Sequence, residues 1–234
     1  MAVASITERG TTSARIPTWL LKVVMAGSGL LWAFFAVVHL WGNLKIYAGA
    51  ESFDSYAHWL REVGYPLVPH EGVLWALRIA LVVALVAHIW AAWVLTARSR
   101  RARGPVKARR RGAMAWNAAA MLPTGVILLV FLVIHVLDLT LGTPPVGPDG
   151  FVHGSAYANL VASFSRPWAA ITYVVAMLAI AVHVAHGTVL AANDLGAQGR
   201  GLRTLMAAIG GIAALALLLG NASIPIAVQI GALS

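Results

Sequence analysis

Hydrophobic residues fill five long stretches of this chain, and polar residues are concentrated in the segments between them. An α-helix needs about 20 mostly apolar residues to cross the hydrocarbon of a bilayer. The stretches are continuously apolar, whereas the strands of a membrane barrel alternate apolar and polar positions. The pattern therefore predicts an all-α integral membrane bundle of five transmembrane helices, forming one domain over residues 1–234. The predicted spans cover about residues 19–44, 73–97, 113–141, 167–192 and 205–227.

Two of the connecting segments carry local signals. Residues 45–72 contain SFDSYAHWLREVG, whose spacing of apolar residues suits a short amphipathic helix at the membrane interface. Residues 142–166 are rich in Pro and Gly and predict irregular structure, which ends where Arg166-Pro167 begins the fourth span.

Composition excludes several classes of protein. Of the 234 residues, 60% are hydrophobic and 11% are charged, which is too apolar for a soluble domain. The chain contains no cysteine, so it forms no disulfide and supplies no thiolate to an iron–sulfur cluster or a structural zinc. Residues 1–15 lack the apolar core and cleavage site of a signal peptide, so we expect them to be retained.

Basic residues indicate how the bundle is oriented. The N-terminal segment, residues 98–111 and the loop near Arg200 and Arg203 hold 13 of the 17 Lys and Arg residues, whereas the other two loops hold six of the eight acidic residues. Lys and Arg are enriched in cytoplasmic loops, so we expect a cytoplasmic N-terminus and an external C-terminus. The net charge of +9 then reflects topology rather than nucleic-acid binding. The cluster RSRRARGPVKARRR could also bind anionic lipid or dock a soluble partner.

Four of the spans carry a histidine in or near the hydrocarbon, and these histidines fall at two depths. His88 and His183 lie ten and eleven residues before a cytoplasmic charged residue, which places both about 15–16 Å from it, in the inner half of the bilayer. His39 and His135 lie six and three residues before an external charged residue, hence about 5–9 Å from it, in the outer half. The first and third spans thus supply an outer pair, and the second and fourth an inner pair.

A histidine inside a membrane is costly, and it faces a bundle interior or bonds another group. Any one of the four could simply hydrogen-bond a neighbouring helix. Together, one per helix and paired by depth, they favour two iron porphyrins, each with two axial histidines. Such a centre has no open position for oxygen or substrate and transfers electrons. His58, His70 and His153 lie in external loops and are expected to be ordinary solvated residues.

Other candidate residues concern a quinone. Gly27, Ser28 and Gly29 lie on the inner half of the first span, where small residues let a macrocycle or quinone ring approach the backbone. They equally let helices pack closely, which is the preferred interpretation. Glu62 and Glu71 could exchange protons with a quinone at the outer end, although such residues are more often solvated. We expect the quinone against a haem at a membrane interface, with the inner end near Ser28 favoured.

Sequence motifs in the first and fourth spans are similar to those of a known family. The segment KVVMAGSGLLWAFFAVVHLWGNLKIYAG has a basic start, an A-x-x-G-L segment and then H-L-x-G-N-L; FDSYAHWL follows as F-x-x-Y; and YVVAMLAIAVHVAHGTVLAANDLG contains H-x-x-H-G before a closing Gly. The chain resembles the membrane cytochrome b subunit of succinate:quinone oxidoreductases, which are succinate dehydrogenases and fumarate reductases, in the five-helix, single-chain, two-haem form.

The resemblance implies a function as membrane anchor and electron conduit in a bacterial cytoplasmic (inner) membrane. It implies that His39 and His135 bind a distal haem b, and that His88 and His183 bind a proximal one. The implied partners are a flavoprotein that oxidises succinate and an iron–sulfur protein that relays electrons, both on the cytoplasmic face. The usual electron acceptor of this form is menaquinone.

Two histidines compete for the inner ligand position on the fourth span. His183 and His186 are three residues apart and face roughly the same side of the helix, so orientation does not choose between them. His183 matches the depth of His88 to about an ångström and is the predicted ligand, whereas His186 is predicted to bond a haem propionate or a quinone oxygen. Some family members carry a proton-transferring glutamate just before this histidine, where this chain has Ala181 and Val182.

Two other functions fit part of the pattern. A cytochrome b subunit of another quinone-linked enzyme, such as a formate dehydrogenase or a hydrogenase, shares the bis-histidine arrangement but does not predict the H-L-x-G-N-L or H-G signatures. A transporter with a histidine proton relay would bind no porphyrin and would often show internal repeats.

Overall fold

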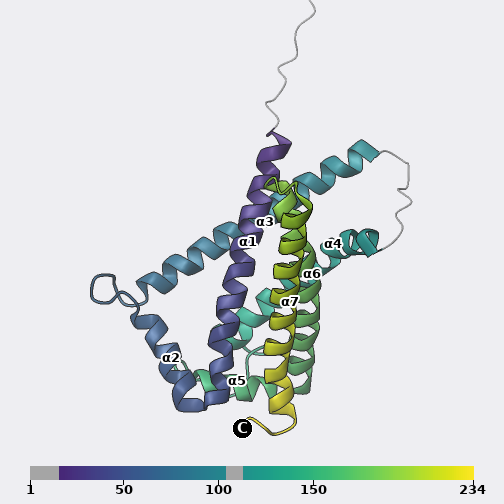
Figure 1. The fold of residues 1–234 in the computed structure, drawn as a ribbon. Helices are drawn as coiled ribbons and strands as arrows, with labels where there is room; N and C mark the ends of the chain where they lie inside the picture. The colour runs from purple at the N-terminus through teal and green to yellow at the C-terminus, as the bar shows by residue number, and fades with distance from the viewer. Residues whose placement is uncertain (1–15, 104–112) are drawn as a thin grey trace, which may run out of the picture.

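The computed structural model describes residues 16–103 and 113–234, and for residues 103 and 113–118 it describes the backbone alone. These residues form helices joined by short connections, with no strand among them (Figure 1). The elements in chain order are α1 (Thr18–Asn43), η1 (Leu44–Ala48), α2 (Ala50–Glu62), α3 (Gly72–Arg103), α4 (Ala113–His135), η2 (Val136–Thr140), α5 (Ala156–Phe164), α6 (Pro167–Asp194) and α7 (Arg200–Gln229).

Five of these helices are long and apolar enough to cross a membrane. The candidate spans are Thr18–Ala48, Gly72–Ala102, Ala119–Thr140, Pro167–Asp194 and Arg200–Gln229. Each predicted span falls on one of them, so the predicted all-α bundle of five membrane helices is confirmed. The fourth begins at Pro167 as expected, because proline has no backbone N–H to leave unpaired in the first turn of a helix.

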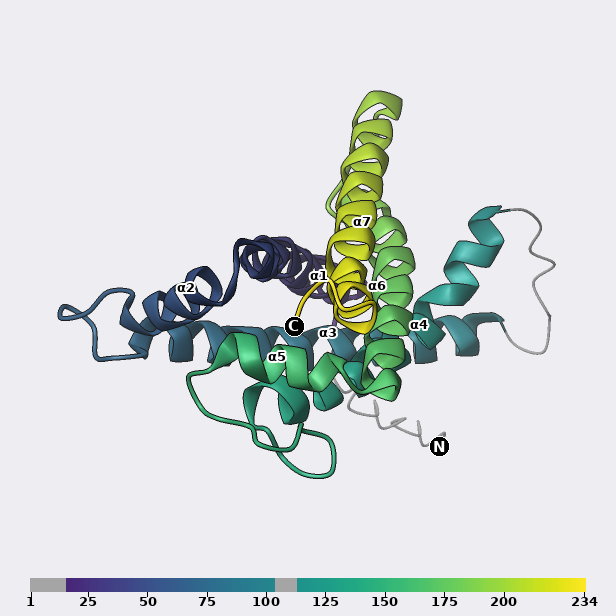
Figure 2. The ribbon, with the colours of Figure 1, turned by 90° about the horizontal axis from the view of Figure 1, so that it is seen from below.

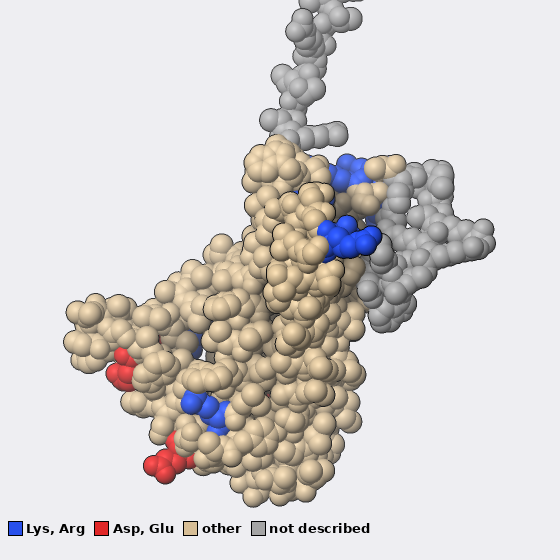
Figure 3. All heavy atoms as spheres, viewed as in Figure 1, with Lys and Arg blue, Asp and Glu red and all other residues tan. Residues whose placement is uncertain are grey.

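The two ends of the bundle differ in charge. The basic end, where α1 begins, α3 ends and α6 turns into α7, carries Lys22, Arg98, Arg200 and Arg203. The opposite end, called the α2–α5 end, holds these two short helices and the C-terminus (Figure 1). On the face in Figure 3, the acidic side chains in view lie at the α2–α5 end together with one group of basic side chains, and two further basic groups lie at the basic end.

Helix α6 is the centre of the assembly. It packs along α7 and also contacts α1 and α4, which lie on either side of it in Figure 2. Close approach of α6 and α7 depends on small residues, since a Cβ at Gly210 would lie 2.9 Å from Thr188 Cβ. Helix α3 packs mainly on α1. Small residues at helix contacts are how membrane helices gain van der Waals packing, because lipid removes the usual hydrophobic drive between them.

The structure corrects the prediction for residues 142–166 and confirms the prediction for residues 45–72. Irregular structure was expected throughout residues 142–166, but Ala156–Phe164 form α5. The Pro and Gly residues of this segment stop at residue 154, and the AYANLVASF that follows buries Leu160 and Phe164 against neighbouring helices. The short helix predicted within residues 45–72 is confirmed as α2.

Candidate functional site

The four membrane histidines lie in the two pairs expected from their depths. The rings of His39 on α1 and His135 on α4 have centres 5.9 Å apart. The rings of His88 on α3 and His183 on α6 have centres 6.4 Å apart. Two imidazoles bound to opposite sides of one metal ion, each at about 2 Å, have ring centres roughly 6 Å apart. The separations in both pairs therefore suit two axial ligands of one iron.

The helices that supply each pair are not close packing partners. Contacts join α1 to α3, α1 to α6 and α4 to α6, whereas packing of α1 on α4 or of α3 on α6 is slight at most in the described residues. The two rings of each pair therefore approach each other from helices that are not closely packed on one another. His39 is an exposed residue in the isolated chain, and the other three histidines are half-buried.

His88 is held through its Nδ1 atom by the first span. This nitrogen lies 3.1 Å from the Met25 carbonyl oxygen and 3.2 Å from Ser28 Oγ. A carbonyl oxygen only accepts, so Nδ1 of His88 carries the hydrogen and donates. The hydroxyl of Ser28 donates to the Val24 carbonyl at 2.6 Å and so is free to accept from the ring. In the neutral ring, Nε2 then keeps its lone pair for a metal.

His183 is held in the same way by the third span. Its Nδ1 lies 3.1 Å from Thr124 Oγ1, and the Thr124 hydroxyl donates to the Ala120 carbonyl at 2.6 Å. The Thr124 oxygen therefore accepts from Nδ1–H, and Nε2 is again left with a lone pair. Outer hydrogen bonds of this kind fix the tautomer and orientation of metal-binding histidines.

A glycine follows each of these hydroxyl residues and lies against the same ring. A Cβ at Gly29 would lie 3.0 Å from His88 Cε1, and a Cβ at Gly125 would lie 3.5 Å from His183 Cε1. Close packing, the preferred interpretation of the small residues in the first span, is thus confirmed at Gly29. At Gly27, a Cβ would meet no atom within 4 Å among the described residues.

Sequence reasoning missed Thr124 and Gly125, although a spacing could have revealed them. Ser28 stands 11 residues before His39, and Thr124 stands 11 residues before His135. Ser28-Gly29 and Thr124-Gly125 lie against His88 and His183, whereas the histidine that follows each dipeptide along the chain belongs to the His39–His135 pair. The first and third spans therefore share the pattern [ST]-G-x9-H, which becomes visible when the two spans are compared.

The His39–His135 pair has different surroundings. The ring of His39 stacks on Phe35, with centres 5.4 Å apart and planes 12° apart. The Nδ1 atom of His135 lies 3.3 Å from the Tyr173 hydroxyl. Phe131 also contacts the His135 ring, with centres 5.7 Å apart. The apolar and aromatic neighbours give this pair few polar partners.

A buried ion pair lies next to His135. Asp138 has no exposed surface, and its Oδ1 accepts from Arg166 Nη2 at 2.6 Å. Its Oδ2 accepts from Ser163 Oγ at 2.5 Å and from Tyr173 Oη at 3.1 Å. Asp138 occupies η2, a π-helical turn that ends α4, and such turns recur at functional sites.

His186 stands apart from the pairs. Its Nε2 atom is buried and has no hydrogen-bond partner among the described residues. A buried polar atom without a partner is rare in proteins and calls for an explanation. The contact of His186 with a propionate or a quinone oxygen stays a prediction.

The polar residues at the α2–α5 end are paired or solvated. Glu62 forms an ion pair of 3.0 Å with His70, and Glu71 forms one of 3.2 Å with Arg61. His58, His70 and His153 are exposed, as predicted for residues of external loops.

Each histidine pair can supply two imidazole ligands to a metal. Within residues 16–103 and 113–234, no group of three or more His, Cys, Asp or Glu residues could hold a metal ion. A porphyrin, which supplies four nitrogens and accepts two axial histidines, would complete the coordination of an iron at either pair.

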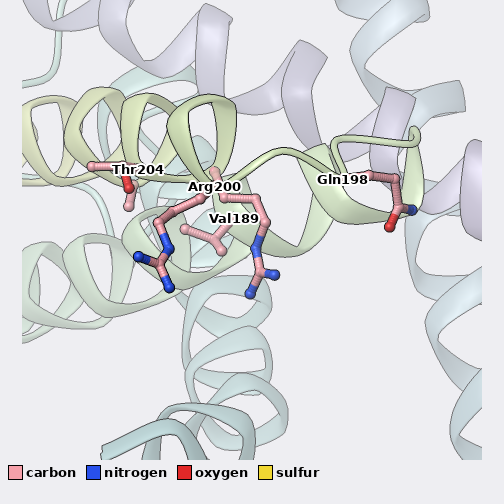
Figure 4. Close-up of a pocket in the computed structure, with 6 residues that line it drawn as sticks. Val189, Gln198, Arg200 and Thr204 are labelled. Carbon is pink, nitrogen blue, oxygen red and sulfur yellow. The ribbon is translucent and has the colours of Figure 1, made fainter.

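A separate cavity of about 560 Å³ opens at the basic end between α6 and α7. Figure 4 shows Arg200 and Thr204 on the first turns of α7, with Gln198 further along the connection from α6. The paired histidines do not line it. The cavity is therefore separate from the histidine site.

Comparison with known proteins assigns the chain to a family. The family model described as succinate dehydrogenase/fumarate reductase transmembrane subunit matches residues 97–219, more than half of the chain. The chain belongs to this family. It is thus a multi-pass membrane protein and the membrane subunit of an oxidoreductase complex. The matched segment includes His135 and His183, whereas His39 and His88 precede it. No curated protein and no solved structure matches the chain.

Proposed function

We propose that this family member is the membrane anchor and haem electron-transfer subunit of a succinate:quinone oxidoreductase. It carries electrons between an iron–sulfur partner subunit and membrane quinone. The observation that carries this proposal is the juxtaposition of four membrane histidines, from four different helices, in two pairs with ring separations of 5.9 and 6.4 Å.

Two b-type haems per chain are proposed, one held by His39 and His135 and one by His88 and His183. The proposal is supported by the ring separations and by the small number of protein ligands near each pair in the described residues. When bound, a haem with two axial histidines supplies one-electron transfer and has no open coordination position for oxygen or substrate.

The chain's own residues prepare the His88–His183 pair for this role. Ser28, Thr124 and the Met25 carbonyl accept hydrogen bonds from the two Nδ1 atoms, which keeps both Nε2 atoms available. The apolar spans around the rings exclude water and lower the local dielectric, and burial of this kind affects reduction potential. Orientation of the ligands is therefore set before the cofactor binds.

A quinone, menaquinone in this proposal, is assigned to the basic end near Ser28 and His186. The unpartnered Nε2 of His186 supports this location, because an imidazole N–H can donate to a quinone carbonyl. Open space beside Gly27 gives a ring room to approach α1. The Ser28 hydroxyl is already bonded to Val24 and His88, so its contribution is to hold His88 beside the quinone.

The basic end is proposed to face the bacterial cytoplasm and to dock the flavoprotein and iron–sulfur subunits. Lys22, Arg98, Arg200 and Arg203 lie there, and further basic residues of the loop 98–111 fall outside the described residues. The positive-inside rule then gives a cytoplasmic N-terminus and an external C-terminus. Family membership favours this function over a formate dehydrogenase or hydrogenase subunit and over a transporter.

Purification of the whole complex from membranes tests the proposal. We expect two haems b per copy of this chain in a haem extraction assay, together with a flavoprotein and an iron–sulfur subunit. One haem or none per chain would overturn the haem assignment. The chain separated from its partners should not reduce a soluble dye with succinate, and if it did, the subunit assignment would be wrong.

A further inference from the structure

His135 is the end of a chain of hydrogen bonds that reaches the loops of the α2–α5 end. Its Nδ1 lies 3.3 Å from the Tyr173 hydroxyl, which lies 3.1 Å from Asp138 Oδ2. Asp138 in turn accepts from Arg166 at 2.6 Å. Three helical elements, α4, η2 and α6, therefore contribute to one connected polar group inside an otherwise apolar region.

The direction of each hydrogen bond follows from the chemistry of the groups. An ionised carboxylate only accepts, so the Tyr173 hydroxyl donates to Asp138. The phenolic oxygen is then free to accept from Nδ1–H of His135. This leaves Nε2 of His135 with its lone pair. A phenol that donates to a carboxylate is a stronger acceptor than a free phenol, because hydrogen bonds in a chain polarise one another.

The rest of the network fixes Asp138 in place. The guanidinium of Arg166 also donates to the carbonyl oxygens of Val146 and Gly147, at 2.8 and 3.0 Å. Ser163 donates to the same carboxylate oxygen as Tyr173. These contacts hold the loop after η2 against the start of α6. They also compensate the free-energy cost of burying the Asp138 carboxylate.

None of the other three paired histidines has such a partner. His88 and His183 donate to neutral hydroxyl or carbonyl oxygens, and His39 has no hydrogen-bond partner among the described residues. His135 is thus the one paired histidine in the described structure whose Nδ1–H is connected to a carboxylate through a single side chain.

We propose that Tyr173, held by Asp138, is a positioning residue that orients His135 and lowers the reduction potential of the haem at the His39–His135 pair. The inference rests on the proposed haem function. A stronger hydrogen-bond acceptor at Nδ1 makes an imidazole a more basic ligand and favours the oxidised metal. The network therefore distinguishes this haem from the one at the His88–His183 pair.

Replacement of Tyr173 by Phe in the intact complex tests the proposal, because it removes the hydroxyl and keeps the ring. Redox titration of the two haems should show the potential of the His39–His135 haem shifted upward. At a fixed applied potential, the ratio of reduced to oxidised haem should rise by up to about tenfold. This corresponds to an upward shift of up to about 59 mV for a one-electron couple. The potential of the other haem should stay unchanged. The low-spin electron paramagnetic resonance signal of the affected haem should shift with the potential.

Tyr47→Phe is the matched control. Tyr47 lies in η1, at the end of the first span, and donates to Ser223 at 2.7 Å, but among the described residues it contacts neither histidine pair. This variant should leave both potentials unchanged. Two haems with unaltered potentials in Tyr173→Phe would overturn the proposal.

Ser163→Ala gives a second test if Tyr173→Phe loses the haem. This change removes a competing donor from Asp138 Oδ2 and keeps Tyr173, so the same haem should shift downward. An unchanged potential in Ser163→Ala would then overturn the proposal. Absence of haem from the wild-type complex would instead contradict the proposed function, so the two failures are distinct.

Discussion

The two histidine pairs have contrasting surroundings. At the His88–His183 pair, both rings donate to neutral oxygens from a neighbouring helix, and a glycine lies against each ring. At the His39–His135 pair, one ring stacks on Phe35 and the other joins a network that contains a buried carboxylate. The first pair is nearly symmetric and the second is not.

In the proposed haem sites, an axial histidine would therefore not determine the properties of its site by itself. The Nδ1 partner sets the tautomer, the orientation and the basicity of the ring, so it tunes whatever metal the ring binds. Two sites built from identical ligands can therefore differ in stability and in potential. The following substitutions separate the contributions of ligands, charges and packing in the two pairs.

The largest effect is expected from loss of a ligand. His183→Ala should abolish the haem at the His88–His183 pair and leave one haem per chain, whereas His186→Ala should keep both. His183 faces His88 with its Nδ1 held by Thr124, while His186 has a free Nε2 and lies outside the ring contact. Haem extraction and reduced-minus-oxidised spectra of the complex measure the outcome. The reverse pattern would make His186 the ligand.

The next largest effect should distinguish the two ends of the bundle. Arg166→Met leaves the buried Asp138 charge without its partner, which costs about 3–5 kcal/mol. The matched control is Lys22→Met, which breaks the Lys22–Asp194 pair of 2.7 Å at the basic end. Lys22 is 46% exposed there, so the loss should be about 1 kcal/mol or less.

Thermal unfolding of the purified complex in detergent, followed by the absorbance of each haem, measures both variants. We expect Arg166→Met to release the His39–His135 haem first. Equal decreases of the unfolding temperature in the two variants would mean that the buried Arg166–Asp138 pair contributes no more to stability than the exposed Lys22–Asp194 pair.

A smaller effect is expected from packing against His88. In Gly29→Val, the new side chain collides with the His88 ring, because its Cβ would lie only 3.0 Å from Cε1. Overpacking of this kind costs about 1–3 kcal/mol, and the haem at this pair should bind more weakly. Gly27→Val, two residues away on the same helix, meets open space and should bind haem as the wild type does. Similar haem contents in the two variants would argue against the glycine contact.

The smallest effect should come from single hydrogen bonds at the same pair. Thr124→Val removes the acceptor of His183 Nδ1–H, whereas in Ser28→Ala the His88 ring keeps the Met25 carbonyl. Thr124→Val should therefore speed haem loss, by up to about tenfold, and Ser28→Ala should do so less. Transfer of haem from the complex to an apoprotein acceptor gives the rates, with Thr124→Ser as the control that restores the hydroxyl. A greater effect of Ser28→Ala would contradict the assigned hydrogen bonds.

Much of the fold was predictable because membrane helices obey a simple length rule. Continuous apolar stretches and a rise of about 1.5 Å per residue were enough to locate five spans and to assign His39, His88, His135 and His183 to two depths. The same local reasoning failed for residues 156–164. Their helix was hidden by the Pro and Gly residues just before it, and burial of Leu160 and Phe164 stabilises it.

The site was only partly predictable for a related reason. Depth along a helix axis can be counted from the sequence, but the angle around the axis and the neighbour at that angle depend on packing. Tyr173 and Asp138 look ordinary in the sequence, and Thr124 stands out only when the first and third spans are compared. Each acquires its role from a residue on another helix or from a turn.

The sequence by itself determined the five apolar helices and which histidines share a level, because hydropathy and helical rise are local properties. Only the tertiary structure decided that the rings of each pair stand about 6 Å apart, that a hydroxyl and a glycine hold one pair, and that a buried carboxylate lies behind the other. Those features depend on how helices cross. Crossing is set by close contacts between residues as distant in the chain as Ser28 and His88, which no local pattern encodes.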